Sequence, residues 1–134
     1  MSSGRHCVAF AFFLVIAGCG SAAPPPQRSA LASLLHGKKF EPHGDYTGAD
    51  TPEDQQPLQA AVDNAIKDVS ALPDPLSAEA VRGRLAKLIV DTDLYATEDR
   101  DEVGRYAVRI WRAAGFRDES HLFPVSDERV LANP

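Results

Sequence analysis

The stretch TEDRDEVGRYAVRIWRAAGF, from Thr97 to Phe116, decides the fold, because it carries clear helical periodicity. Its apolar residues recur at spacings of three and four, which places them on one face of a helix. Thr97 is the predicted N-cap of this helix. Gly115 stands where a C-terminal glycine cap belongs, and Phe116 can fold back on the last turn. The predicted core positions are Val103, Tyr106, Ala107, Ile110 and Ala114.

Two further helices are predicted on the N-terminal side of this stretch. One begins at Thr51 with Pro52 as its first helical residue, and prolines at 73 and 75 end it. The other begins at Ser77 and leaves a basic outer face. The predicted inward residues of the first helix are Leu58, Val62, Ala65 and Val69, and those of the second are Val81, Leu85, Leu88 and Ile89.

A short helix is predicted from Arg28 to Gly37, with its leucines facing inward. The following stretch, KKFEPHGDYTGAD, is rich in turn residues, and we expect its Phe40 and Tyr46 to pack on the helices. Strand alternation is almost absent. The sequence therefore predicts an all-α fold, a small bundle of three main helices plus a short N-terminal helix, over residues 30–123. Residues 124–134 are predicted to be a ragged C-terminal tail.

The N-terminus has the pattern of a secretory signal peptide over residues 1–18. Its eleven uncharged residues, 7–17, span about 16 Å as a helix, about half of the roughly 30 Å hydrocarbon core, so a transmembrane helix is not expected. The four residues IAGC that end at Cys19 resemble the bacterial lipobox. That resemblance implies cleavage before Cys19 and lipidation of its sulfur. Residues 19–29 would then form a lipidated cysteine with a proline-rich linker that forms neither helix nor strand.

Charge and cysteine content exclude several classes of function. After removal of residues 1–18 the chain has 13 basic and 19 acidic residues, with no basic block, which argues against nucleic acid binding. With Cys7 removed and Cys19 lipidated, no thiol remains for a disulfide or a metal. The remaining histidines are scattered, so we expect no metal site and no cofactor.

Six carboxylates lie between Asp91 and Glu102, and three interpretations of them stay open. The first is helix electrostatics, in which the helix dipole stabilises acidic side chains at the helix start and Asp101 pairs with Arg105. The second is a calcium loop of the EF-hand type, with ligands from Asp91, Asp93, Asp99 and Glu102, although Ala96 stands where the loop needs glycine. The third is catalysis by paired carboxylates, which requires burial that a solvated helix start does not provide. The six residues are Asp91, Asp93, Glu98, Asp99, Asp101 and Glu102.

A candidate interaction surface lies further along the same helix. Trp111 stands at the border of the apolar face, with Arg105, Arg109 and Arg112 on the outer face. Tryptophan and arginine dominate binding hot spots, so we regard these four residues as a candidate patch for an unknown protein partner. The alternative is that Trp111 is an edge-of-core residue.

The stretches FEPHGDYTG, LQAAVDNAIKDV and ATEDRDEVGRYAVRIWRAAGF resemble the bacterial family called domain of unknown function 4844. The similarity covers residues 31–118, and its distinctive part is Thr97, Glu98, Asp99 and Arg100 with Tyr106 and Gly115. The resemblance implies a small helical fold and adds no catalytic role. It also implies that residues 97–100 form a structural cap that pairs with another helix. The RDESHLFPVSDERV stretch departs from the family pattern.

The sequence therefore favours a bacterial lipoprotein, attached to a membrane through Cys19, whose domain faces the periplasm and binds another protein without catalysis. Gly20 follows the cysteine in place of an aspartate, so the outer membrane is the expected location. A narrower hypothesis is an inhibitor or immunity protein. The competing class is a hydrolase that uses carboxylates or His43.

Overall fold

The computed structural model describes residues 25–119 and residue 122, and this part of the chain forms four α-helices and no strand. The all-α prediction is confirmed. The helices are α1 (Pro26–His36), α2 (Pro52–Ser70), α3 (Ala78–Asp91) and α4 (Thr97–Ala113). The predicted signal peptide, Cys19, residues 20–24 and the tail 124–134 lie outside the described residues.

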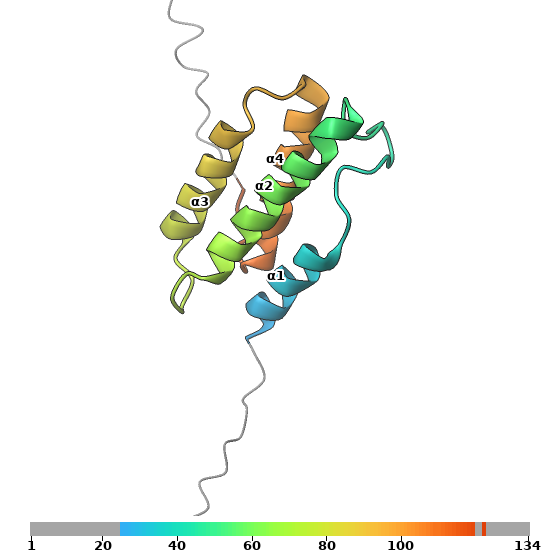
Figure 1. The fold of residues 1–134 in the computed structure, drawn as a ribbon. Helices are drawn as coiled ribbons and strands as arrows, with labels where there is room; N and C mark the ends of the chain where they lie inside the picture. Colours follow the sequence, from blue (N-terminus) through green and yellow to red (C-terminus); the bar gives the residue numbers. More distant parts are fainter. Residues whose placement is uncertain (1–24, 120–121, 123–134) are drawn as a thin grey trace, which may run out of the picture.

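The four helices form a bundle in which α1 and α3 run in one direction and α2 and α4 in the other (Figure 1). Both α2 and α4 contact each of the other three helices. Among the described residues, 18 apolar side chains are buried in the core. They include the predicted inward positions of all three main helices except Ile89, which is partly buried. Phe40 and Tyr46 are buried as expected, at 1% and 4% exposure.

We call the two ends of the bundle the near end, where the described chain begins, and the far end (Figure 1). The near end holds the start of α1, the α2–α3 connection and the end of α4, and Pro25, Pro75 and Phe116 line one groove there. The far end holds the segment 37–51, the α3–α4 connection and the starts of α2 and α4. The described chain therefore enters at the end opposite to the starts of α2 and α4.

Local capping signals set most helix boundaries. The hydroxyl of Thr51 accepts a hydrogen bond from the Asp54 amide at 3.3 Å, and that of Ser77 accepts one from the Ala80 amide at 3.2 Å. The predicted cap at Thr97 is wrong. Ala96 is the N-cap of α4 and no side chain caps it, because Thr97 is itself the first helical residue.

The C-terminus of α4 ends in a Schellman motif, which confirms the glycine cap at Gly115. Gly115 has φ of +98°, and its amide donates to the Arg112 carbonyl at 3.0 Å. The Phe116 amide donates to the Trp111 carbonyl at 3.2 Å, and the two rings stack with centroids 4.5 Å apart. These are the hydrogen bonds and the apolar contact that define the motif.

The expectation that residues 21–29 form no helix is wrong for its last four residues, since α1 begins at Pro26. Proline is tolerated in the first turn because its missing N–H has no partner there. The reason this turn forms is Arg28, whose guanidinium donates to the backbone carbonyls of Ser70 and of Leu72, the latter at 2.7 Å, and pairs with Asp74 at 2.7 Å. Arg28 therefore caps the C-terminus of α2 from another helix, which links the chain entry to the bundle.

We expect Arg28→Ala to lower the free energy of unfolding by about 1.5–3 kcal/mol, because charged donors to carbonyl groups contribute on this scale. Urea denaturation monitored by circular dichroism measures it. Arg84→Ala is the control, since Arg84 is exposed and forms no salt bridge with a described residue. Equal stability of the two variants would contradict the capping role.

Candidate functional site

The segment 37–51 folds over the start of α4 through a tight turn between His43 and Tyr46. The two residues exchange both backbone hydrogen bonds, each at 2.9 Å. Gly44, with φ of +54°, supplies the left-handed conformation inside this turn, and Gly48, with φ of +99°, supplies another just after it. Phe40 anchors the segment, with its ring centroid 5.5 Å from that of Tyr106 in α4.

Asp99, in the first turn of α4, is buried with 1% of its surface exposed. The Tyr46 hydroxyl donates to Oδ1 at 2.7 Å, and the Asp50 amide donates to Oδ2 at 3.1 Å. Both carboxylate oxygens therefore bind the segment 37–51. A buried carboxylate is tolerated only with such partners.

Glu102 is fully buried, one turn further along α4. Its Oε1 lies 2.9 Å from Nε2 of His43, and its Oε2 accepts a hydrogen bond from Arg105 at 2.8 Å. The His43 side chain is 45% exposed and the Arg105 side chain 52% exposed. The buried carboxylate thus lies below two cationic or polar groups that reach the surface.

We call Tyr46, Asp99, Glu102, His43 and Arg105 the far-end network. It corrects the prediction that the acids at the start of α4 are solvated, since Asp99 and Glu102 are buried. A signal for this existed in the sequence: Asp99 precedes Val103, Tyr106 and Ile110 at the spacing of the core face. Within the predicted motif of residues 97–100, Asp99 contacts the segment 37–51, whereas the resemblance implied a contact with another helix.

The other predicted acids behave differently from Asp99 and Glu102. Asp101 is exposed and forms no ion pair with Arg105, because the Arg105 guanidinium is turned toward Glu102. Asp93 pairs with Arg100 at 3.2 Å. Glu98 is exposed, and Asp91 pairs with Lys87 within α3.

The four positions of the calcium hypothesis do not come together. Asp91 and Asp93 are exposed in ion pairs of their own, whereas Asp99 and Glu102 are buried in the far-end network. Among residues 25–119 and 122, no group of three or more histidine, cysteine or acidic side chains could hold a metal ion.

Burial shapes the ionisation of the far-end network. Burial raises the pKa of Tyr46 well above its usual range, and the hydrogen bond to Asp99 raises it further. Burial also raises the pKa of Tyr106. The hydrogen bond to Glu102 raises the pKa of Arg105. The two carboxylates therefore favour a protonated phenol and a charged guanidinium above them.

The four residues of the candidate interaction patch on α4 do not form one exposed surface. Trp111 is 3% exposed, its Nε1 donates to the Asp118 carbonyl at 2.8 Å, and the Arg82 guanidinium lies 5.7 Å from its ring. It lies within the core. Arg109 lies 4.8 Å from the Tyr106 ring centroid, and Arg112 pairs with Glu119. The tryptophan is thus an edge-of-core residue, and the arginines lie over different neighbours.

A second buried polar contact holds the start of the segment 37–51, and sequence reasoning missed it. Lys39 is 1% exposed, and its Nζ lies 2.7 Å from Oδ1 of Asp63 in α2, at ion-pair distance without hydrogen-bond alignment. Nζ also donates to the Gly37 carbonyl at 2.9 Å. No local pattern marks this pair, because its members lie 24 positions apart.

The far-end network can orient an imidazole, since a buried carboxylate holds one nitrogen of His43 while the ring remains half exposed. This is how a general base is positioned. In the described part of the chain, however, no serine or threonine hydroxyl is hydrogen-bonded to His43. A pocket of about 100 Å³ beside the network is lined by Asp45, Tyr46, Glu98, Asp101 and Arg105. The arrangement thus binds the segment 37–51 to α4 and presents acids around a shallow pocket.

The chain matches no protein-family model, no curated protein and no solved structure. The resemblance to domain of unknown function 4844 therefore stays a prediction. Within the described residues, none of the helices has the length and apolar character that a membrane-crossing segment requires.

We expect Tyr46→Phe to lower the free energy of unfolding by about 1–3 kcal/mol, because it leaves a buried oxygen of Asp99 without its donor. Urea denaturation at neutral pH measures the loss. Tyr95→Phe is the matched control, since Tyr95 is partly buried and its hydroxyl has no hydrogen bond to a described residue. A loss of the same size in both variants would show that the Asp99 contact contributes nothing specific.

The contribution of Tyr46 should also depend on pH. Because the pKa is raised in the folded state, the unfolded chain ionises first, from about pH 10 upward. The contribution is therefore complete below this pH and decreases as the pH rises. The stability difference between the wild type and Tyr46→Phe should be smaller at about pH 11 than at about pH 8. A difference that stays constant or grows over this range would contradict the effect.

Proposed function

We propose that the protein is a lipid-anchored protein of the bacterial envelope, attached through Cys19, and that its helical domain binds another protein at the far end. The proposal rests on the lipobox-like residues before Cys19 and on the position of Pro25 at the near end. A tether that enters at the near end leaves the far end directed away from the membrane. We expect the domain to face the periplasm and the outer membrane to be the site of attachment.

The observation that carries the binding proposal is the acidic surface of the far end. Five exposed carboxylates there form no ion pair with a described residue. Three of them line the shallow pocket beside the far-end network. We call the five the acidic end; they are Asp45, Asp50, Glu53, Glu98 and Asp101.

Unpaired surface charges of one sign favour a partner of the opposite sign, because complementary charge accelerates encounter and excludes wrong partners. The partner expected is therefore a protein with a basic surface. A narrower form of the proposal is an inhibitor or immunity protein that blocks a basic toxin or cell-wall enzyme in the periplasm. In this proposal the half-exposed His43 and the buried Glu102 hold the segment that carries part of the acidic end against α4.

The anchor is tested by replacing the cysteine. We expect the wild-type chain in the membrane fraction, with a mass that corresponds to residues 19–134 plus acyl chains, because two or more chains give stable attachment. Cys19→Ala should abolish the lipid mass and leave the leader uncleaved. An intact first methionine in the wild type, or an unmodified Cys19, would contradict the proposal.

The binding role is tested by photo-crosslinking in intact cells, with a benzophenone side chain in place of Glu53 at the acidic end. We expect a defined adduct that is lost when Asp45→Lys and Asp101→Lys are added, because they reverse the charge. Asp68→Lys with Glu79→Lys is the matched control, since both are exposed acids away from the far end. An adduct that the first pair leaves unchanged would contradict recognition by the acidic end.

A further inference from the structure

Helix α3 buries one face and leaves the opposite face uncovered. Val81, Leu85 and Leu88 are buried against the bundle. On the opposite face Val90 is 73% exposed, and Leu94, just beyond the helix, is fully exposed. Figure 1 shows α3 at the edge of the bundle. Burial of Val90 and Leu94 against another molecule would be favourable.

Gly83 lies on this same exposed face, seven positions before Val90. Apart from its chain neighbours and the backbone of its own helix, no atom of the described chain lies within 4 Å of the position that a Cβ would take there. The fold therefore does not require this glycine, although a glycine inside a helix costs about 1 kcal/mol relative to alanine. Gly83 and the exposed Ala86 make the N-terminal half of the face flat, and we call it the flat half. Val90 and Leu94 project from the C-terminal half. A flat half allows another backbone to approach closely.

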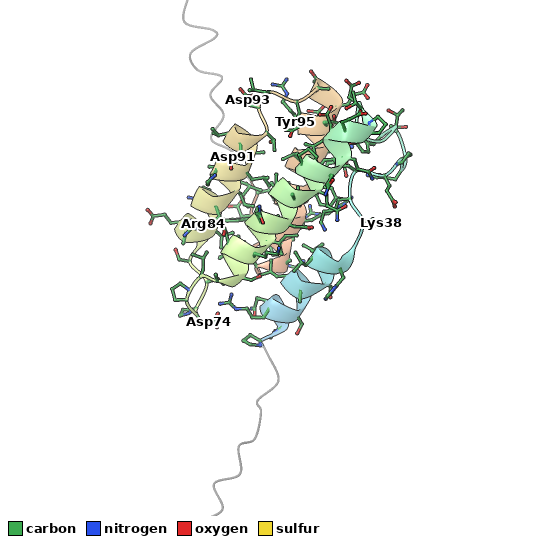
Figure 2. The ribbon with its side chains drawn as sticks, in the orientation of Figure 1. Lys38, Asp74, Arg84, Asp91, Asp93 and Tyr95 are labelled. Atoms are coloured by element: carbon green, nitrogen blue, oxygen red, sulfur yellow. The ribbon has the colours of Figure 1, made fainter. Side chains whose placement is uncertain are left out.

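Charged residues border this face. Arg84 is exposed and forms no salt bridge with a described residue. Asp91 ends the helix and pairs with Lys87, one turn before it. By helical spacing, Arg84 and Asp91 border the same side of the face. Arg82 borders the other side, but its guanidinium lies over the Trp111 ring within the bundle. Figure 2 shows Arg84 and Asp91 at different levels of α3.

We propose that this face binds a second copy of the chain, with the two α3 helices packed antiparallel about a two-fold axis. In such a pair each side of the face meets the same side of the other copy in reversed order. An axis midway between residues 87 and 88 places Arg84 opposite Asp91 of the second copy. By the two-fold symmetry this charge pair forms twice, once from each copy.

The same axis also matches the shape of the two halves. Val90 lies level with residue 85 of the second copy, between its Gly83 and Ala86, so a projecting side chain meets the flat half. The carboxylate of Asp91 has a second oxygen beyond its contact to Lys87, which can accept from Arg84 of the second copy. A single helix pair is at the low end of interface size, so the association is weak and depends on local concentration.

Disulfide trapping tests the arrangement in membranes of cells that express the full chain. One copy carries Ala86→Cys and a differently tagged copy carries Val90→Cys. The mixed pair joins residue 86 of one copy to residue 90 of the other, and its two positions are offset by about 1.5 Å along the helix axis. The like pairs, 86 with 86 and 90 with 90, are offset by about 4.5 Å and about 7.5 Å. We expect the mixed disulfide to exceed both like disulfides. The wild-type chain is the control, because any crosslink that it forms comes from Cys7 or Cys19.

Gly83→Trp is the second test, because residue 83 is exposed, its Cβ would contact no neighbouring side chain, and an indole there would fill the flat half of the face. We expect loss of the mixed disulfide without a lower melting temperature, because tryptophan is a better helix former than glycine. Ala60→Trp, on the exposed side of α2, should leave the disulfide intact. Like disulfides that equal or exceed the mixed one, a mixed disulfide that survives Gly83→Trp, or a Val90→Cys crosslink only to a different protein would each overturn the proposal. The tests in membranes rest on the proposed lipid anchor, which the mass measurement on Cys19→Ala checks separately, and none of these outcomes depends on the acidic end.

Discussion

The structure depends on two carboxylates, Asp99 and Glu102, that the first turns of α4 bury beneath the segment 37–51. Burial of a charged group is unfavourable unless partners replace its water. Here the partners come from the Tyr46 hydroxyl, the Asp50 amide, His43 and Arg105. The need to satisfy these oxygens therefore fixes the conformation of a segment that forms no helix.

This constraint also determines which surface is free to act. His43 and Glu102 have the geometry of an oriented base, but their contacts serve to attach the segment to α4. Lys39 and Asp63 attach the start of the same segment to α2. These groups are engaged inside the domain. In the described chain, the exposed acids around the far-end network have no ion-pair partner, and Val90 and Leu94 beside α3 have no apolar cover. Both are surfaces suited to contact with other proteins, at different places on the bundle.

The helices and their caps could be predicted because they are local. Thr51, Ser77 and Gly115 act on backbone groups within a few positions, and the apolar spacing of each main helix marks its buried face. The burial of Asp99 and Glu102 was missed because their partners Tyr46 and His43 lie 53 and 59 positions away. Arg28 lies where the predicted linker and the predicted short helix overlap, and its role was missed for the same reason, since it acts on carbonyl groups more than 40 positions distant. Trp111 stood at the border of the apolar face, and only the packing of Phe116 and Arg82 shows that it is covered.

Amide hydrogen exchange measured by NMR on the wild type and on Asp99→Ala tests most directly whether the buried carboxylates hold the segment. The amides of Asp50 and Tyr46 are hydrogen-bonded in the folded segment, and that of Val62 lies inside α2. The account predicts slow exchange at all three in the wild type, and fast exchange only at Asp50 and Tyr46 in the variant. Equal exchange of the Asp50 and Tyr46 amides in the two chains would contradict it.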